Sequence, residues 1–332
     1  ALFRQRLNEK FGFRFSVATN SCTSSLRASL ALLKIGRGDE VITTPWTMVA
    51  TNTAILEQQA TLVFADIEYD TLNINPKSIA EKITDKTRAI MCVHYAGCPC
   101  KLDEIRKIGR ERNLPIVEDA AQALGAKYKG KYVGSIGELV CFSFQAVKIV
   151  TSGDGGLIAT NKKGYYEELK KRIWFGIDKD KRVDSPLGKF PKDITVLGFK
   201  YTMNDITAAL GLVGLNHFDE VLERRKNIAK MYREELEDCS KIELLHYSRN
   251  VESSCWMFPI HVRDRLKFAK YMREHDIEVS VHNWRNDRYS IFGGKQDLPV
   301  TDKVNSDIIH IPIHANLTDK EVEKVVKTIK GF

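Results

Sequence analysis

RAIMCVHYAGCPCKLDEIRKIGRERNLPIVED, residues 88–119, contains an apolar run, an amphipathic segment and a second apolar run. The apolar runs at 88–95 and 115–119 are short and rich in Val and Ile, which predicts buried strands. Between them, apolar residues recur at helical spacing: Leu102, Ile105 and Ile108. A strand, a helix and another strand in this order are typical of a parallel sheet covered by helices.

The same alternation continues on both sides of this unit. Further strands are predicted at 41–44, 61–67, 139–144 and 156–160, and a helix where Leu26, Leu30 and Leu33 recur. From about residue 204 the pattern becomes a helix with Ile206, Leu210 and Val213, a charged helix at 218–238, a strand at 254–262, a helix at 265–275, a strand at 277–284 and a helix at 318–330. We expect an α/β fold in which a large domain, residues 1–214, holds a mostly parallel sheet between helices. A small α+β domain follows at 215–332.

Charge, cysteine content and hydropathy narrow the class of protein. The 332 residues carry a formal net charge of +8, but basic and acidic residues are interspersed, so nucleic acid is not an expected partner. No apolar stretch is long enough to predict a membrane span, and the N-terminal segment has no signal-like apolar core. Seven cysteines without a disulfide framework indicate reduced thiols and a cytoplasmic location. The chain starts without Met, which leaves a longer native N-terminus open.

Polar residues follow several predicted strands, at the sheet edge where open parallel sheets bind ligands. Residues 20–25, NSCTSS, open a helix and could bind an anion there, although for this segment taken alone we favour a plain N-cap. Glu118 and Asp119 close an apolar strand, where a buried acid needs a partner. A pyridinium nitrogen would be such a partner for Asp119, and a capping role is the alternative. For Glu118 we favour pairing with a basic neighbour.

Lys148 follows the strand at 139–144 and precedes the Gly-rich segment TSGDGG at 151–156. A lysine just past a buried strand can have the lowered pKa that a Schiff-base lysine requires, and an ordinary surface lysine is the alternative. The segment is not a Walker loop, because no Gly-Lys-Ser/Thr follows. His310 and His314 are separated by Ile-Pro-Ile, which is incompatible with a regular helix, so no metal site is predicted.

Taken together in order, these segments resemble the DegT/DnrJ/StrS family of pyridoxal-5′-phosphate (PLP)-dependent nucleotide-sugar aminotransferases over nearly the whole chain. The resemblance rests on NSCTSSL (20–26), GRGDEVITTPWTMVAT (36–51), ADIEYDTLNINP (65–76), IVEDAAQALGAKYKGKYVGSIG (116–137), FSFQAVKIVTSGDGG (142–156), LGFKYTMNDITAALGL (197–212) and IPIHANLTDKE (311–321). It implies the aspartate-aminotransferase fold, type I of the PLP-dependent transferases, with PLP as cofactor.

The resemblance also implies roles for particular residues. Lys148 would be the catalytic lysine that carries the cofactor, Asp119 would hold its pyridine nitrogen, and Gln122 would lie beside the ring. The cofactor phosphate would be held by Thr23, Ser24 and Ser143, and by Lys200 of the partner subunit, which implies a homodimer with shared active sites. Met48 stands where the family commonly has an aromatic stacked on the ring, so the role of the neighbouring Trp46 is left open.

Two further departures from the family lie where substrate choice is made. Gln145 replaces a residue that is often His or Tyr, and VHNWRNDRYSIFG at 281–293 replaces a His-Tyr-containing loop near the sugar. We take Gln145, Trp284, Arg285 and Asn286 as candidate substrate residues.

The implied reaction transfers an amino group from L-glutamate, which becomes 2-oxoglutarate, to a nucleotide-diphosphate keto-deoxysugar. The product would be an amino sugar for glycan or O-antigen-type biosynthesis, and the segment FSFQAVK favours C4 over C3 as the aminated carbon. UDP, GDP and dTDP stay open as the nucleotide. A PLP-dependent sugar dehydratase is one alternative, but such relatives carry His at the position of Lys148. A non-catalytic regulator that retains the fold is the other.

Overall fold

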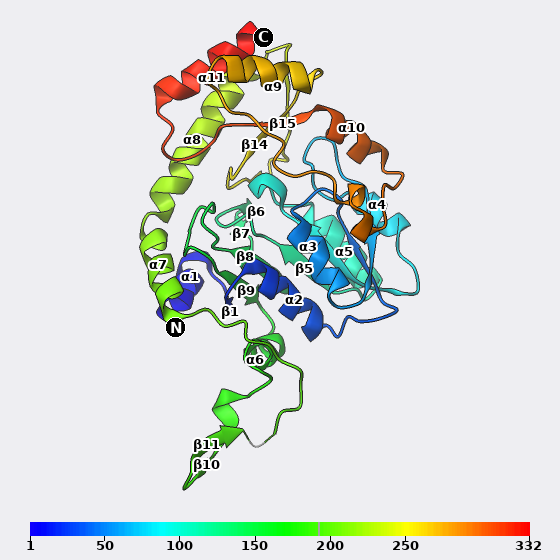
Figure 1. Ribbon diagram of the computed structural model, residues 1–332, viewed down its shortest axis with the longest axis vertical. Coiled ribbons are helices and arrows are strands. Elements are labelled where there is room, and N and C mark those ends of the chain that lie inside the picture. The colour runs from blue at the N-terminus through cyan, green and yellow to red at the C-terminus, as the bar shows by residue number, and fades with distance from the viewer. Residues whose placement is uncertain (192) are drawn as a thin grey trace.

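The computed structural model describes residues 1–191 and 193–332, and its centre is a seven-stranded sheet covered by helices (Figure 1). The strand order is β1-β9-β8-β5-β4-β2-β3. The strands are β1 Phe15–Thr19, β2 Glu40–Thr43, β3 Thr61–Phe64, β4 Thr87–Val93, β5 Ile116–Asp119, β8 Leu139–Ser143 and β9 Gly156–Thr160. Neighbours from β8 to β3 pair in parallel, whereas β9 pairs antiparallel with both β8 and β1. The expected mostly parallel α/β sheet is confirmed.

The sequence-based prediction lacks β1, whose residues alternate apolar and hydroxyl side chains. Ser16 and Thr19 are both fully buried. Ser16 Oγ donates to Asn8 Oδ1 at 2.5 Å, and the hydroxyls of Thr19 and Ser25 lie 2.6 Å apart. Because these buried hydroxyls have partners, a strand with a polar appearance fits inside the sheet.

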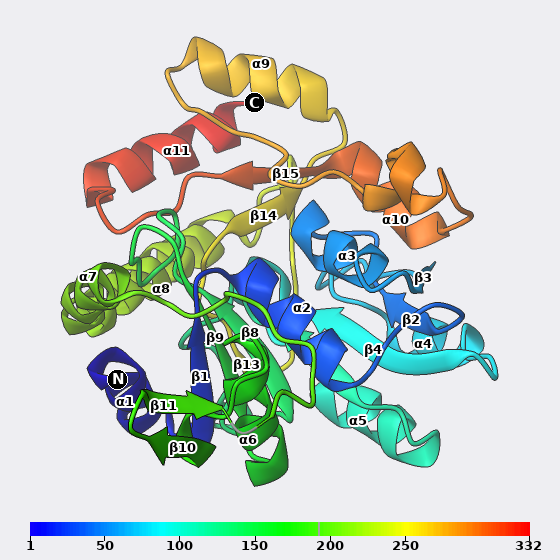
Figure 2. The ribbon, with the colours of Figure 1, turned by 60° about the horizontal axis from the view of Figure 1, so that its bottom comes forward.

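Both faces of the sheet are covered, as continuous apolar strands require. The helices of the N-terminal part are α1 Leu2–Phe11, α2 Cys22–Leu32, α3 Val49–Leu56, α4 Pro76–Glu81, α5 Leu102–Glu111 and α6 Lys163–Arg172. Successive strand residues point to opposite faces, so Val41 packs with Leu26 of α2 while Ile42 packs with Leu102 and Ile105 of α5. Figure 2 shows α2 and α5 at different sides of the strands.

A second, smaller layer is formed by the C-terminal part of the chain. Its antiparallel sheet has the order β12-β14-β15, with β12 Glu243–Leu244, β14 Phe258–His261 and β15 Ile308–Ile311. Its helices are α9 Arg265–Glu274, α10 Pro299–Asp307 and α11 Asp319–Gly331, joined to the large layer by α7 Asp205–Asn216 and α8 Phe218–Leu236. The start of α8 packs on the core of the large sheet through Leu222, whereas from Ile228 onward it packs on the small sheet. The domain division at 214/215 stays a prediction.

The strand predicted at 277–284 is wrong. Within it, only Ser280 forms a bridge, with His310, and the third strand of the small sheet is β15. Past Ser280 the chain leaves the small sheet and contacts the large domain instead. There the backbone N–H of Asn286 donates to Pro45 O at 2.7 Å, so this backbone group is not available for pairing with a strand of the small sheet.

The remaining elements lie at the periphery. A hairpin of β10 Arg182–Ser185 and β11 Gly188–Pro191 projects away from the large domain (Figure 1). A further small sheet joins β6 Lys127–Tyr128, β7 Lys131–Tyr132 and β13 Val251–Glu252, and short 3-10 turns occur at Tyr95–Gly97, Lys179–Lys181, Asn286–Arg288 and Ser290–Phe292. Over the described part of the chain, no helix combines the length and the apolarity needed to cross a membrane.

Candidate active site

The residues expected to bind the cofactor ring gather at the carboxyl edge of the large sheet. Asp119 is the last residue of β5, Ser143 is the last residue of β8, and Lys148 lies in the loop that follows β8. The charge on Lys148 lowers the pKa of Asp119, and the charge on Asp119 raises the pKa of Lys148. Both residues lie at or just past the carboxyl ends of neighbouring parallel strands, β5 and β8, at the sheet edge where such sheets bind ligands.

Asp119 is a buried carboxylate that accepts two hydrogen bonds. Thr51 Oγ1 donates to Oδ2 at 2.7 Å, and the backbone N–H of Ala121 donates to Oδ1 at 3.0 Å. Burial raises the pKa of Asp119, against these two donors and the charges on Lys148 and His94, which lower it. A cation placed beside Asp119 would stabilise its ionised form further.

Lys148 is half-buried against an aromatic ring. Its Nζ lies 3.7 Å from the centroid of the Trp256 ring, and Trp256 Nε1 donates to the carbonyl of Val147 at 3.0 Å. Burial lowers the pKa of Lys148 to about 8, although Cys22 and Asp119 act in the opposite direction. Burial thus increases the fraction of this amine that is neutral near neutral pH, and the neutral form is what nucleophilic attack on a carbonyl requires.

The N-terminus of α2 lies where the anion site is expected, and its binding of an anion stays a prediction. Ser21 is the N-cap, its Oγ accepts from the backbone N–H of Ser24 at 3.1 Å, and Thr23 lies in the first turn. Gly156 of β9 packs directly on this turn, since a Cβ at that position would lie 2.5 Å from the carbonyl carbon of Ser21. The free N–H groups of a helix start, with hydroxyls around them, suit a phosphate. Ser143 Oγ, from β8, accepts from Gln145 N at 3.3 Å.

Gln122 is buried, close to Asp119 in the sequence, and its side chain binds the backbone of the turn at Tyr95–Gly97. Its Oε1 accepts from the backbone N–H of Ala96 at 2.6 Å, and its own carbonyl accepts from Ser254 Oγ at 2.9 Å. The contacts of Gln122 are thus to protein, and its place beside a cofactor ring stays a prediction.

Two of the expected cofactor residues lie on the protomer surface. Met48, the N-cap of α3, is 55% exposed. Lys200 is also exposed, with Nζ 4.0 Å from the centroid of the Trp174 ring and 3.2 Å from Thr202 Oγ1. The structure does not bring Lys200 into contact with Asp119 or Lys148 of its own chain, and its reach to a partner stays a prediction.

The candidate substrate residues divide into two kinds. Gln145 and Trp284 are exposed, and the Trp284 ring lies between the guanidinium groups of Arg265 and Arg288, at 5.3 and 4.5 Å. Arg285, in contrast, is buried and paired with Asp287 at 2.6 Å and with Asp302.

Asn286 is fully buried and contacts the loop before α3. The polar groups of Arg285 and Asn286 are thus engaged within the protein, and their contact with substrate stays a prediction.

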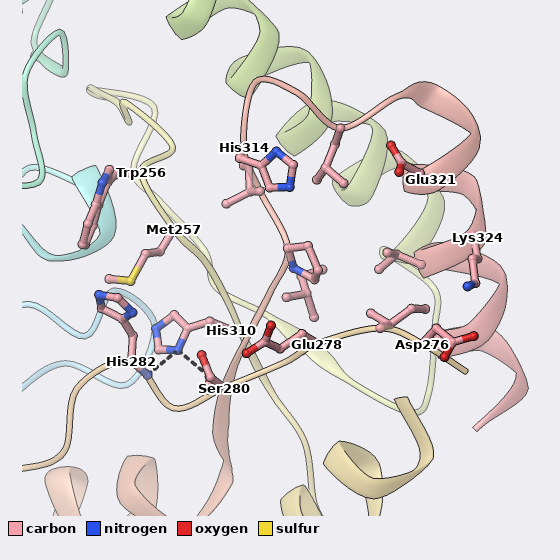
Figure 3. Close-up of a pocket in the computed structure, with 16 residues that line it drawn as sticks. Trp256, Met257, Asp276, Glu278, Ser280, His282, His310, His314, Glu321 and Lys324 are labelled. Carbon is pink, nitrogen blue, oxygen red and sulfur yellow. Dashed lines mark hydrogen bonds between the residues drawn. The ribbon is translucent and has the colours of Figure 1, made fainter. Parts of the chain in front are cut away.

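A cavity of about 450 Å³ lies on the small-domain side of Trp256. Figure 3 shows its wall, in which Trp256, His282 and His310 come from three different segments of the chain. The His282 ring lies 5.2 Å from the Trp256 ring, on which Lys148 also packs, and burial and the charge of Lys148 lower the pKa of His282. Lys148 and Asp119 do not line this cavity, which adjoins their site through Trp256 and His282.

Sequence reasoning missed Thr51, Trp256 and His282 as neighbours of the site. Thr51 lies within the motif at 36–51 and His282 within the loop at 281–293. Both segments were recognised from the sequence, but nothing about a threonine or a histidine at these positions marked it as a neighbour of the site. Trp256 had no signal, because it lies in an ordinary alternating strand pattern.

Glu118, the acid next to Asp119, pairs with basic residues as expected. Its carboxylate lies 3.1 Å from His94 Nε2 and 2.9 Å from Arg106. Burial would raise the pKa of Glu118, but these two partners outweigh it and lower the pKa. Because the Glu118 carboxylate is engaged with His94 and Arg106, Asp119 is the acid that we assign to the site.

A half-buried lysine of lowered pKa and a buried carboxylate, placed at or just after the ends of neighbouring parallel strands, fit the PLP-dependent enzymes of fold type I. The large sheet with its antiparallel β9 and the small C-terminal layer complete this fold.

Comparison with known proteins agrees. A model of the DegT/DnrJ/EryC1/StrS aminotransferase family matches residues 1–330. The chain is 38% identical to an uncharacterised protein of Methanocaldococcus jannaschii, over 99% of this chain and 88% of that protein. It is 30% identical to the GDP-perosamine synthase of Escherichia coli O157:H7, over 99% of this chain and 89% of that protein. The crystal structure of the sugar aminotransferase CalS13 from Micromonospora echinospora matches with a TM-score of 0.94 at 33% identity, over 99% of this chain and 90% of that chain.

The chain therefore belongs to the DegT/DnrJ/EryC1/StrS aminotransferase family. Its class of enzyme is the PLP-dependent sugar aminotransferases.

Proposed function

We propose that this enzyme transfers the amino group of L-glutamate to the keto group of a nucleotide-linked deoxysugar, with PLP as cofactor and C4 as the aminated carbon. The observation that carries the proposal is the placement of the buried Asp119 at the end of β5 and of Lys148 just after the neighbouring parallel strand β8. The relative named GDP-perosamine synthase supports a nucleotide-linked substrate. The choice of C4 and the amino donor rest on the family resemblance of the FSFQAVK segment, at 142–148.

The residues present fit the cofactor. Lys148 would hold it covalently through Nζ, Asp119 would keep a proton on its ring nitrogen, and the start of α2 with Thr23, Ser24 and Ser143 would hold its phosphate. When bound, PLP supplies an electron sink for the carbon that loses its proton. Lys148, once released, would move that proton, since its lowered pKa lets it both accept and donate near neutral pH.

A homodimer would complete the site. Exposed apolar residues on α7, Ile206, Leu210 and Val213, follow Lys200 in the sequence and suit burial against a second copy. In such a dimer Lys200 would reach the cofactor phosphate of the partner. Met48 would cover the cofactor ring, and Gln145 and Trp284 would face the substrate. The family resemblance and the exposure of these side chains support this arrangement.

The cytoplasm is the location we propose. All seven cysteines are free thiols and five of them are buried, which suits a reducing compartment.

Borohydride reduction of the PLP-loaded enzyme, followed by peptide mass spectrometry, tests the cofactor site. We expect the pyridoxyl label on Lys148, and no label in Lys148→Ala, because Lys148 is the one lysine among residues 1–191 and 193–332 whose pKa is lowered by burial. A label on another lysine would overturn the assignment. The absence of any label would favour a non-catalytic protein that retains the fold.

The substrate is tested with a panel of UDP-, GDP- and dTDP-linked keto-sugars and L-glutamate, read by the mass of the products. We expect a product in which the keto oxygen is replaced by an amine, together with 2-oxoglutarate. Loss of water from the sugar without gain of nitrogen would identify a dehydratase instead.

A further inference from the structure

A chain of buried hydroxyls ends on the carboxylate of Asp119. Thr51 Oγ1 donates to Asp119 Oδ2 at 2.7 Å, and Thr47 Oγ1 lies 2.9 Å from Thr51 Oγ1. An ionised carboxylate only accepts hydrogen bonds, so the single hydroxyl proton of Thr51 points to Asp119. Thr51 must then accept from Thr47, which sets the direction of donation from Thr47 to Asp119.

Asn286 holds Thr47 from the other side. Its Nδ2 donates to the carbonyl of Thr47 at 2.7 Å, and its Oδ1 accepts from Asn52 Nδ2 at 3.0 Å. Asn52 also donates to the carbonyl of Thr44 at 3.1 Å. Asn286 and Asn52 are fully buried, so loss of either amide would leave buried polar groups unpaired. The small-domain loop at 284–286 is thus fastened to the loop that leads into α3.

The same amide also contacts the backbone of Trp284, whose ring lies near Arg265 of α9. Asn286 Nδ2 lies 3.2 Å from the carbonyl oxygen of Trp284, whose ring is 39% exposed. These hydrogen bonds form one continuous series from the carbonyl of Trp284 through Asn286, Thr47 and Thr51 to Asp119. Packed polar networks of this kind have defined geometry because each member needs its partner.

We propose that Thr47, Thr51 and Asn286 form a positioning network that orients Asp119 toward the cofactor ring and couples it to the substrate loop at 284–286. The inference rests on the proposed PLP site. None of the three side chains touches the cofactor in this account: they act through Asp119, and their effect is to favour its ionised form.

Other charged and titratable groups also face Asp119, and each stays unchanged in the variants that test the network. They are Lys148 from the loop after β8, His94 from the end of β4, Cys22 from α2 and Cys141 from β8. The charges on Lys148 and His94 lower the pKa of Asp119, so they act in the same direction as Thr51. A change seen on removing the hydroxyl alone can accordingly be assigned to Thr51.

The test measures the dissociation constant of PLP by quenching of protein fluorescence, across about pH 5 to pH 8. Thr51→Val keeps the side-chain shape but removes the donor, so the pKa of Asp119 rises and binding is lost at higher pH. The acid limb is the pH range in which PLP affinity falls on acidification, and we expect its midpoint to rise by about one pH unit in Thr51→Val. At a pH below the midpoints of both proteins, the variant should therefore bind PLP about tenfold more weakly than the wild type. Thr51→Ser, which restores the hydroxyl, should return the limb to its wild-type position.

Thr53→Val is the matched control on the same helix, because its hydroxyl donates to the carbonyl of Val49 at 2.8 Å, away from the site. It should leave the acid limb unchanged. Asn286→Ala should shift the limb in the same direction as Thr51→Val, by less, and should also raise the KM for the keto-sugar. If Thr51→Val does not fold by circular dichroism, Thr47→Val makes the same measurement one step further along the network.

Equal weakening of PLP binding at every pH would mean that Thr51 only supports the fold, and the inference would be overturned. If the pH profile of PLP binding in Asn286→Ala is identical to that in Thr53→Val, the proposed coupling between Asp119 and the loop at 284–286 is refuted. A wild-type protein that binds no PLP would instead refute the proposed function, so the two failures are distinguishable.

Discussion

At the scale of single residues, Lys148 and Asp119 have opposite charges and complementary environments. Lys148 lies on the face of Trp256 and loses water there, whereas Asp119 is buried among donors. Their mutual attraction partly offsets both desolvation costs. This pairing leaves one amine and one acid ready for a ligand that carries a carbonyl and a basic ring nitrogen.

The lowered pKa of Lys148 gives a pH prediction for the protein free of cofactor. Only the neutral amine attacks a carbonyl, so the rate of covalent PLP attachment should rise with pH and level off above about 8, where Lys148 is deprotonated. Stopped-flow absorbance of the bound cofactor would measure this profile. In Asp119→Asn the midpoint should fall, since the charge that raises the pKa of Lys148 is gone. A midpoint near the ordinary lysine value of 10.5 would mean that Lys148 is solvated.

Replacing Asp119 by Asn tests the acid. The variant should fold, because the amide oxygen can still accept from Thr51 or Ala121, but a neutral amide cannot hold a protonated ring nitrogen. The loss of one buried charge partner, about 3 kcal/mol, corresponds to a fall in turnover of about a hundredfold. Glu118→Gln is the control, with an effect on thermal stability through Arg106 and His94. Near-normal turnover in Asp119→Asn would mean that another acid faces the nitrogen.

At the scale of elements, α7 has its apolar face outward. Ile206, Leu210 and Val213 are spaced by four and three residues and so lie on one side of the helix, yet they are 79%, 53% and 59% exposed. The spacing correctly predicts the helix, but the face does not pack on its own protomer. A stripe of this kind on a soluble fold indicates a surface that is covered by another chain.

Leu210→Lys therefore should weaken the proposed dimer by at least about tenfold, because a charge would be placed in an apolar contact. Sedimentation velocity over a concentration series would measure the dimer constant. Leu266→Lys is the matched control, since Leu266 on α9 is 81% exposed and lies in the small domain. If both variants associate like the wild type, α7 is not the interface.

At the scale of the whole molecule, both subunits of the proposed dimer contribute residues to each active site. If Lys200 reaches the partner's cofactor phosphate, Lys200→Ala should lose on the order of 1.5–3 kcal/mol of a charge-assisted contact. Mixing this variant with Lys148→Ala should then restore activity. In a mixed dimer one site receives both defects and the other receives neither, so random exchange should give about a quarter of the wild-type activity.

Exchange of subunits is verified by native mass spectrometry with one chain tagged. Activity that stays at the level of the parent variants while mixed dimers are present would show that Lys200 acts within its own subunit.

The sequence by itself determined six of the seven strands of the large sheet, all but β1. Apolar runs of strand length mark β4, β5 and β8, and parallel strands bring their carboxyl ends to one edge. Asp119 and Lys148 follow such runs directly, so local pattern was enough to place both at that edge.

Tertiary structure alone decided the contacts that connect distant segments. Thr51 and Asp119 are 68 residues apart, and Thr47 and Asn286 are 239 apart. It also decided that Ile308–Ile311, and not the segment at 277–284, forms the third strand of the small sheet. A hydrogen bond between remote residues depends on how whole elements pack, and the residue types along the chain carry no local signal of its partner.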